Sequence, residues 1–398
     1  MGDRNDLIDI NVPPPPGLQR ARVAALAIGV VAAVACLIGA FADPNQFFHS
    51  YLMAFMFWLG ISLGSLAVAM MQYLTGGVWA FVMRRPLEAA SRALPLMLVL
   101  FVPILFGLHV LYPWTLPQVR ATDATILAKA AYLNVPFFVA RAAIYFAVWL
   151  FLAWRVNRWS ADNDRTGDPR YLRKLGRLGG PGLVLYAFTI TFASIDWLMS
   201  LEPHWFSTIF GMIIMAGQGL SALAFATLIL VLLSRERPLS DLLRVTTMRD
   251  VGNMMLAFVM LWAYTSFSQL LLIWAGNLPE EIPWYVHRLG VGWQWIGLAL
   301  AVFHFFVPFV LLLMRRTKRV FTALRAVVVL LLFMRLLDLF WIVGPETHQG
   351  RFVVSWQDFA TTIAIGGLFA AVFAWQLGRR TLLPLNDPLE LMAALRRH

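Results

Sequence analysis

Charged residues are scarce in this chain of 398 residues: they make up 13% of it, whereas 60% of the residues are hydrophobic. A typical soluble domain is about 25% charged and about 45–50% apolar. This composition excludes an ordinary soluble domain and predicts an all-α, polytopic membrane protein. The net charge of +11 does not indicate nucleic-acid binding, because the basic residues lie in short loops beside apolar runs, where they report topology.

Cysteine is almost missing, and histidine is rare. The single cysteine, Cys36, excludes a disulfide, an iron–sulfur cluster or a cysteine-type zinc site built from this chain alone. A b-type haem needs two imidazoles that face each other at one depth. Only His109 and His304 lie clearly within apolar runs, and their depths differ. We therefore expect no cofactor bound by this chain itself.

Long apolar runs, in contrast, are abundant. A helix needs about 20 apolar residues to cross a bilayer, and ten runs of roughly that length or more are present. They cover residues 20–42, 48–74, 92–112, 131–154, 181–200, 207–233, 251–275, 286–314, 320–343 and 357–378. The sequence therefore predicts ten transmembrane helices.

Most of the lysine and arginine residues lie in the tails and in every second loop, between spans 2 and 3, 4 and 5, 6 and 7, and 8 and 9. The opposite loops hold only Arg120, Lys129, Arg288 and Arg351. Since basic loops remain on the cytoplasmic side, both termini are predicted to be cytoplasmic. The strings Glu202–His204 and Glu346–His348 then lie on the outer face, which is periplasmic in a Gram-negative cell.

The chain also contains a repeat. Gly60 and Leu63 of span 2 match Gly217 and Leu220 of span 6, and Asp196 at the end of span 5 matches Asp338 in span 9. Spans 2–5 and 6–9 thus read as two parallel four-helix bundles, with spans 1 and 10 peripheral. The predicted organisation is a cytoplasmic, proline-rich tail (1–19), span 1 (20–47), bundle 1 (48–200), bundle 2 (201–343), span 10 (344–378) and a cytoplasmic tail (379–398).

Polar side chains inside the spans are the candidates for chemistry, because a buried charge in a membrane needs a partner, a proton or water. The candidates for a proton path are Arg141, Asp196, Tyr264, Ser266, His304, Arg335 and Asp338. Arg335 precedes Asp338 by three residues, so the two share a helix face. The natural counter-charge of Arg141 is Asp196. Both pairs could equally be structural ion pairs.

A quinone site is a second interpretation of the same end of the molecule. Such a site needs a carboxylate or imidazole that exchanges a proton with a ring oxygen inside an apolar groove. His109, Asp196 and His204 are the candidates. The aromatic residues near the span ends are expected to form an interfacial belt, and they are Trp114, Trp197, Trp205, Trp284, Tyr285 and Trp356.

Several long motifs resemble one family. They are Phe47–Tyr51, Phe101–Trp114, Ser194–Gly211, Leu261–Gln269 and Phe303–Pro308, and they are similar to the ActF subunits of bacterial alternative complex III, within the wider family of NrfD/PsrC-type membrane subunits. The resemblance covers residues 20–380. It implies two four-helix bundles with two peripheral helices, in a multi-pass protein of the bacterial inner membrane.

The resemblance also implies a function. The chain would be a subunit of a respiratory quinol:electron-acceptor oxidoreductase complex, acting as a scaffold and proton-translocation path without a redox cofactor of its own. Its partners would be membrane lipids, a related NrfD-like subunit, an iron–sulfur subunit and c-type cytochrome subunits, and could include a terminal oxidase. The iron–sulfur clusters and haem c would belong to those subunits.

Two other functions stay open at this point. One is the direct quinol-binding anchor, for quinone or menaquinone, of an NrfD/PsrC-type oxidoreductase. The other is an independent proton-coupled transporter. The parallel repeat counts against the transporter, because many secondary transporters are built from inverted repeats and broken helices.

Overall fold

The computed structural model describes residues 12–243, 245–290, 292–347, 351–384 and 386–387. The protein is 83% helical, and the described residues contain no strand. Within these residues, ten helices are long and apolar enough to cross a membrane. The prediction of an all-α, multi-pass membrane protein is therefore confirmed.

The spans lie close to their predicted positions. They are α1 (Gly17–Ala42), α2 (Pro44–Thr75), α4 and α5 (Arg84–Ser91 and Leu94–Phe106), α9 (Val135–Thr166), α10 (Arg170–Trp197), α11 (Phe210–Leu232), α13 (Val245–Gly276), α15 with the π-helical segment η4 and α16 (Trp293–Ala299, Leu300–Phe306 and Val307–Leu313), α18 (Phe321–Thr347) and α19 (Trp356–Leu377).

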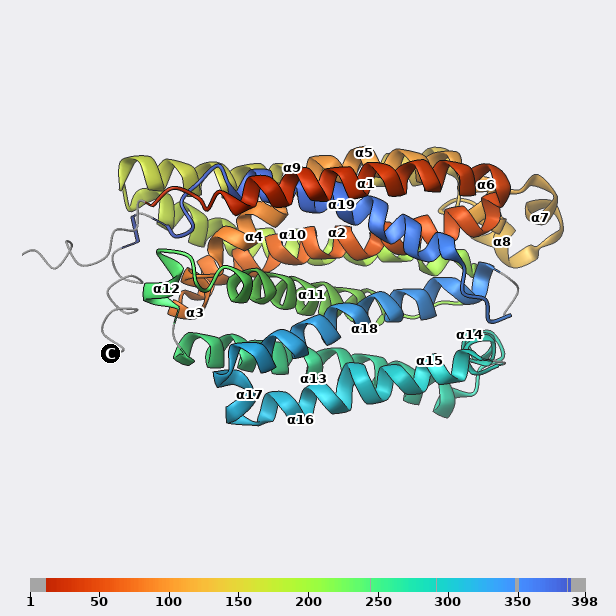
Figure 1. The fold of residues 1–398 in the computed structure, drawn as a ribbon. Coiled ribbons are helices and arrows are strands. Elements are labelled where there is room, and N and C mark those ends of the chain that lie inside the picture. Colours follow the sequence, from red (N-terminus) through yellow and green to blue (C-terminus); the bar gives the residue numbers. More distant parts are fainter. Residues whose placement is uncertain (1–11, 244, 291, 348–350, 385, 388–398) are drawn as a thin grey trace, which may run out of the picture.

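Short helices occupy the two ends of the molecule (Figure 1). One end carries α3 (Val78–Phe81), α12 (Leu239–Leu242) and α17 (Arg315–Arg319). The other end carries α6 (Leu108–Leu111), η2 (Pro113–Thr115), α7 (Pro117–Thr122), α8 (Ala124–Ala128), η3 (Met199–Leu201) and α14 (Ile282–Leu289). The first end holds the basic loops, so it is the end predicted to face the cytoplasm; we call the second the opposite end.

Four predicted spans need correction. The third begins earlier than predicted and ends at Phe106, with Gly107 as its C-cap residue. Phe48 packs against Gly107 so closely that a β-carbon there would lie 2.2 Å from its ring. The fourth, predicted at 131–154, runs from Val135 to Thr166, because its polar last turns continue the helix beyond the apolar run. The fifth begins at Arg170, since its polar first turns extend the helix beyond the apolar run. The eighth begins at Trp293: residues 286–289 belong to α14, and Gly292, with φ of 96°, separates the two helices.

Helices α2 and α11, the first members of the two repeats, form the centre of the protein. Both are buried along most of their lengths. They pack against each other at Gly64, where a β-carbon would lie 2.1 Å from the carbonyl oxygen of Gln218. Small residues let helices approach this closely in membranes. If the predicted repeat is correct, its two copies meet along their first helices.

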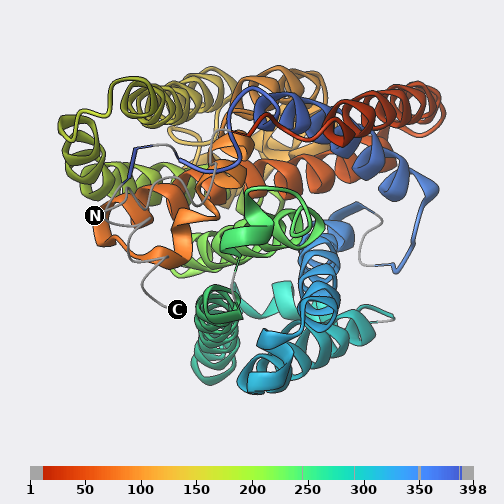
Figure 2. The ribbon, with the colours of Figure 1, turned by 60° about the vertical axis from the view of Figure 1, so that its left-hand side comes forward.

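Each central helix is surrounded by the rest of its own repeat. Helix α2 packs against α4, α5 and α10, while α9 packs against α10 and α5; α11 packs against α13 and α18, and η4 fills the space between α13 and α18. Figure 2 shows the second group, coloured green to blue, below the first, coloured orange to yellow-green. Bundle 1 and bundle 2 below refer to these two groups.

Helices α1 and α19 pair with each other, and α19 also packs on α2. Gly367 lies against Gly29, where a β-carbon on Gly367 would be 2.4 Å from the Gly29 Cα. At the start of α19, Asp358 accepts hydrogen bonds from Gln46 and Ser50 of α2. The outer face of α1 is rich in exposed aliphatic side chains, as expected of a helix in contact with lipid.

Candidate functional site

The first predicted ion pair, Arg141 with Asp196, forms in bundle 1 and is buried away from solvent. Asp196, at the end of α10, is fully buried and accepts hydrogen bonds from Nε and Nη2 of Arg141 in α9, both at 2.8 Å. The Tyr145 hydroxyl donates to the same carboxylate at 2.7 Å. The Arg141 guanidinium lies over the Tyr132 ring, 3.8 Å from its centroid. Two parallel hydrogen bonds are the strongest arrangement of this pair, so both charges are fully satisfied within the protein.

Most of the tryptophans assigned to the interfacial belt are buried instead. The exposed fractions are 1% for Trp114, 0% for Trp197, 2% for Trp205 and 4% for Trp284. Trp197 packs against rings of bundle 1 directly beside Asp196, and Trp205 stacks on Trp284 with 4.6 Å between ring centroids. A belt residue must reach the lipid interface, so that prediction was wrong for these four. Trp356 is exposed.

The second predicted pair forms within α18 of bundle 2 and is less enclosed. Arg335 donates through Nη1 to Oδ2 of Asp338, and Trp262 of α13 donates to the same oxygen at 3.2 Å. Both contacts engage Oδ2, and among the described residues no hydrogen-bond donor contacts Oδ1. The Arg335 side chain crosses α11 at Gly217, where a β-carbon would lie 2.3 Å from the guanidinium carbon.

Asp338 lies on the wall of a cavity of about 610 Å³ in bundle 2. The cavity is bounded by α11, α13, α14, α15 with η4, and α18, and most of its lining is apolar or aromatic. Tyr264 and Ser266, two of the predicted proton-path residues, line it together with Asp338. Tyr264, Phe267 and Phe306 are lining residues that are also exposed on the side of the bundle. The cavity therefore opens sideways, toward the lipid.

His304 lies next to this cavity, behind Trp262. It is fully buried, and its ring meets the Trp262 ring edge-on, with 4.2 Å between centroids. Within the described part of the chain, neither ring nitrogen of His304 has a hydrogen-bond partner. The residue lies in η4, a π-helical turn, and such turns occur frequently at functional sites. A buried imidazole without a partner is costly, so His304 is an unusual residue at this position.

The three residues predicted to form a quinone site, His109, Asp196 and His204, each have contacts of their own. His109 lies in α6, is exposed, and contacts Thr115. His204 is also exposed and pairs with Asp123 at 2.6 Å. Asp196 is enclosed by its own partners, as described above.

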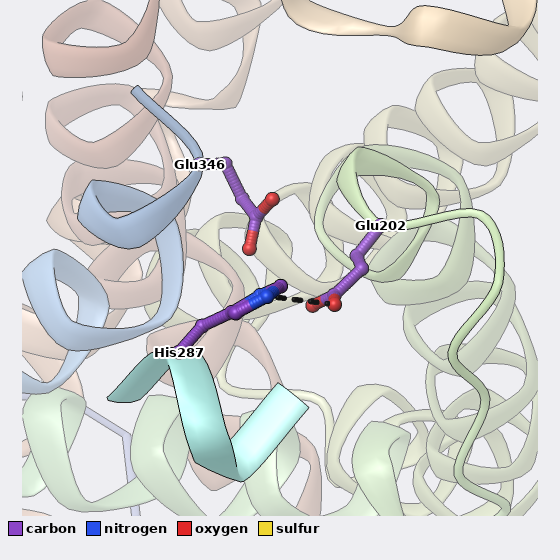
Figure 3. A group of neighbouring side chains, drawn as sticks. All are labelled: Glu202, His287 and Glu346. Carbon is purple, nitrogen blue, oxygen red and sulfur yellow. Dashed lines mark ion pairs between the residues drawn. The ribbon is translucent and has the colours of Figure 1, made fainter. Parts of the chain in front are cut away.

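A charged cluster at the opposite end lies beside the cavity and was only partly predicted. Arg288 of α14 is 1% exposed and contacts Glu202, which follows η3, and Glu346 in the last turn of α18, at 3.5 and 3.3 Å. His287 lies 3.4 Å from Glu202 (Figure 3). Glu202 and Glu346 belong to strings noted in the sequence, but His348 of the second string lies outside the described residues. Arg288 was noted only as a loop charge.

Burial changes the acid–base properties of α14. The pKa of Arg288 is lowered, mainly because its guanidinium is removed from water, although Glu346 and Glu202 oppose this effect. Burial also raises the pKa of Tyr285 to about 12. Tyr285 is therefore a neutral hydroxyl at the wall of the cavity near neutral pH, and Arg288 keeps its positive charge because a guanidinium is not deprotonated in proteins.

A further charged network, at the basic end, was not predicted. Glu88 of α4 is fully buried and accepts hydrogen bonds from Tyr73, Arg85, Ser160 and Arg380. In the sequence, these arginines indicated only the orientation in the membrane. Glu88, which pairs with them, lies in a short polar segment before the predicted apolar run, so it was not considered as a buried residue. The network joins α4 to α9 and to the segment after α19.

Searches for relatives add nothing to this geometry. The chain matches no protein-family model, and no curated protein matches it.

Proposed function

We propose that this chain is an integral membrane subunit of a respiratory quinol:electron-acceptor oxidoreductase complex, in which it acts as a scaffold and carries protons through bundle 2. The partners would be those that its motifs imply: a related NrfD-like subunit, an iron–sulfur subunit and c-type cytochrome subunits. The proposal places the chain in the bacterial inner membrane with both termini in the cytoplasm.

The observation that carries the proton-path part is the arrangement around the cavity of bundle 2. Asp338 has an available carboxylate oxygen on the cavity wall, and His304, with two unpartnered ring nitrogens, lies one tryptophan ring away. Carboxylates, imidazoles and hydroxyls in a membrane interior are the groups from which proton relays are built. Tyr264 and Ser266 supply hydroxyls on the same wall.

The equivalent position in bundle 1 supports a division of labour between the two repeats. Asp196 has both oxygens occupied by Arg141 and Tyr145 and does not line a described cavity. A carboxylate held by two parallel hydrogen bonds exchanges a proton only after the pair breaks. Asp196 therefore stabilises bundle 1, and Asp338 is the residue placed for exchange.

A second function, direct quinol binding, is favoured by the shape of the same cavity. Ligand sites are typically apolar clefts of about 300–1,000 Å³ with a few fixed polar groups. This cavity has that size, opens toward lipid, and presents Asp338, Gln269 and Tyr285 in an aromatic wall. A quinol headgroup would then bind beside Asp338 rather than at His109 and His204.

Membership of a complex is tested by purifying the tagged full chain from its native membranes in mild detergent. We expect c-type haem to copurify, with an absorption spectrum that changes to the reduced form on addition of quinol. A chain that purifies free of haem and of quinol-reducible centres, from membranes that contain both, would contradict the proposal.

The role of the chain within the complex is tested with Asp338→Asn and the matched control Asp196→Asn, in complexes reconstituted into liposomes. A proton path predicts that Asp338→Asn lowers proton translocation per quinol while quinol oxidation continues. A quinol site predicts that the same variant abolishes quinol oxidation and weakens inhibitor binding. If Asp338→Asn leaves turnover, proton yield and inhibitor binding unchanged, both functions of the cavity are excluded.

A further inference from the structure

Three side chains with metal-ligating groups meet at the opposite end of bundle 2. Glu202 comes from the turn after η3, His287 from α14, and Glu346 from the last turn of α18. One ligand atom from each lies within 4.8 Å of the other two. Figure 3 shows the two carboxylates directed toward each other, with the His287 ring reaching toward the space between them.

The geometry is close to that of a zinc site. Zinc bonds of about 2.0–2.2 Å in a tetrahedral arrangement place ligand atoms about 3.3–3.6 Å apart. Nδ1 of His287 and Oε1 of Glu202 are already 3.4 Å apart. The Glu346 ligand atom lies within 4.8 Å of both, and Glu346 is in the last turn of its helix. Three protein ligands and one open position are the usual set of a non-structural zinc site.

Arg288 holds the two carboxylates in place from the protein side. Its guanidinium donates to the backbone oxygens of Trp284, Trp341 and Ile342, so its own position is fixed. It contacts Oε2 of Glu202 and Oε1 of Glu346. One oxygen of each carboxylate is thus engaged, while Oε1 of Glu202 and Oε2 of Glu346 remain for another cation. Such supporting hydrogen bonds orient metal ligands in known sites.

The cluster is open to water on one side. Two carboxylates meet one guanidinium in it. His287 is half exposed, with a side-chain exposed fraction of 49%, whereas Glu202 and Glu346 are mostly buried at 13% and 19%. A cation from the aqueous phase can therefore reach the site through the histidine. An imidazole with two carboxylates suits zinc and similar transition metals better than magnesium or calcium.

We propose that Glu202, His287 and Glu346 bind a divalent transition-metal ion of the zinc class, with Arg288 orienting the two carboxylates. The ion would join the end of α10, helix α14 and the end of α18. Helix α14 also supplies Trp284, Tyr285 and Leu289 to the wall of the cavity. Metal binding would therefore hold α14 against α18 and restrict movement at that end of the cavity. This inference does not depend on what the cavity binds.

The test uses Zn²⁺ and the purified full chain in lipid nanodiscs. We expect one Zn²⁺ per chain by equilibrium dialysis with elemental analysis, and a raised melting temperature, because a ligand that binds only the folded state stabilises it. His287→Ala and Glu346→Gln should each weaken Zn²⁺ binding at least about tenfold, a loss typical of changes around metal sites. Co²⁺ should give the visible absorption of a tetrahedral nitrogen–oxygen site in the wild-type protein only.

His204→Ala is the matched control. His204 is also an exposed histidine paired with a carboxylate, at the same end of the molecule, but it is not part of the three-residue group. Its loss should leave Zn²⁺ stoichiometry and affinity unchanged. His287→Gln keeps a polar side chain of similar size but removes the imidazole ligand. Weak Zn²⁺ binding in this variant, with a wild-type melting temperature in the absence of metal, would show loss of a ligand and not a folding defect. Equal Zn²⁺ affinity in wild type and in His287→Ala, or no binding by folded wild-type protein at millimolar Zn²⁺, would overturn the proposal and leave an ordinary ion-pair cluster.

Discussion

At the scale of single residues, the two aspartates that occupy equivalent positions in the repeat differ in how completely they are paired. Asp196 uses both carboxylate oxygens within the protein, whereas Asp338 uses only Oδ2. Removing one partner of a buried ion pair leaves an uncompensated charge, which costs more than the pair contributes.

We therefore expect Asp196→Ala to destabilise the protein by about 3–5 kcal/mol, seen as a lower midpoint of thermal unfolding in detergent. The double variant Arg141→Met with Asp196→Leu should recover part of this loss, since it removes both charges. Arg165→Ala is the control: its pair with Asp162 is exposed, and exposed pairs contribute about 0–1 kcal/mol. A single variant as stable as wild type would show that the buried pair does not stabilise bundle 1.

Gly217 provides the space in which Arg335 reaches Asp338. Gly217→Ala should push the guanidinium aside and separate it from Asp338, lowering the melting temperature and changing the fluorescence of Trp262, which donates to the same oxygen. Gly276→Ala is a matched control, because a β-carbon there meets no atom within 4 Å. Unchanged stability and fluorescence in Gly217→Ala would mean that Arg335 has another route to Asp338.

At the scale of helices, the positions of the spans could be predicted because lipid demands about 20 apolar residues in each. The ends could not, since α10 continues as a polar helix outside the apolar run and α14 is separated from α15 only by the backbone conformation at Gly292. Sequence spacing correctly paired Arg335 with Asp338. It did not predict the cavity or the π-helical turn around His304, because both depend on how side chains from several helices pack.

The pairing of α1 with α19 depends on two glycines. Gly367→Leu should separate the helices, because even a β-carbon would lie 2.4 Å from the Gly29 backbone. The single cysteine, Cys36 of α1, is buried in the native structure and serves as the reporter: its reaction with a membrane-permeant maleimide should become faster in Gly367→Leu.

Gly17→Leu is the control for this experiment. It adds the same side chain to α1 at a position where a β-carbon meets nothing, and Cys36 should react at the wild-type rate. Slow labelling in Gly367→Leu would show that α1 is held by contacts other than this crossing.

At the scale of the whole molecule, the distribution of basic residues predicts the orientation in the membrane. In a Cys36→Ser background, Thr166→Cys places a thiol at the basic end, at the last residue of α9, and Gln118→Cys places one at the opposite end, in α7; both positions are exposed. An impermeant maleimide added to intact spheroplasts should label only the variant at 118. In inverted vesicles it should label only the variant at 166. The reverse pattern would contradict the assignment of the termini to the cytoplasm.

The lateral opening of the cavity in bundle 2 has a consequence for how any occupant arrives. A molecule that enters between Tyr264, Phe267 and Phe306 does so by diffusion within the bilayer, after it has already left the water. The occupancy of the cavity then depends on the mole fraction of that molecule in the lipid and not on its total concentration in the sample. Apparent dissociation constants should accordingly rise in proportion to the amount of lipid added, so values measured at different lipid-to-protein ratios become comparable only when expressed per mole of lipid.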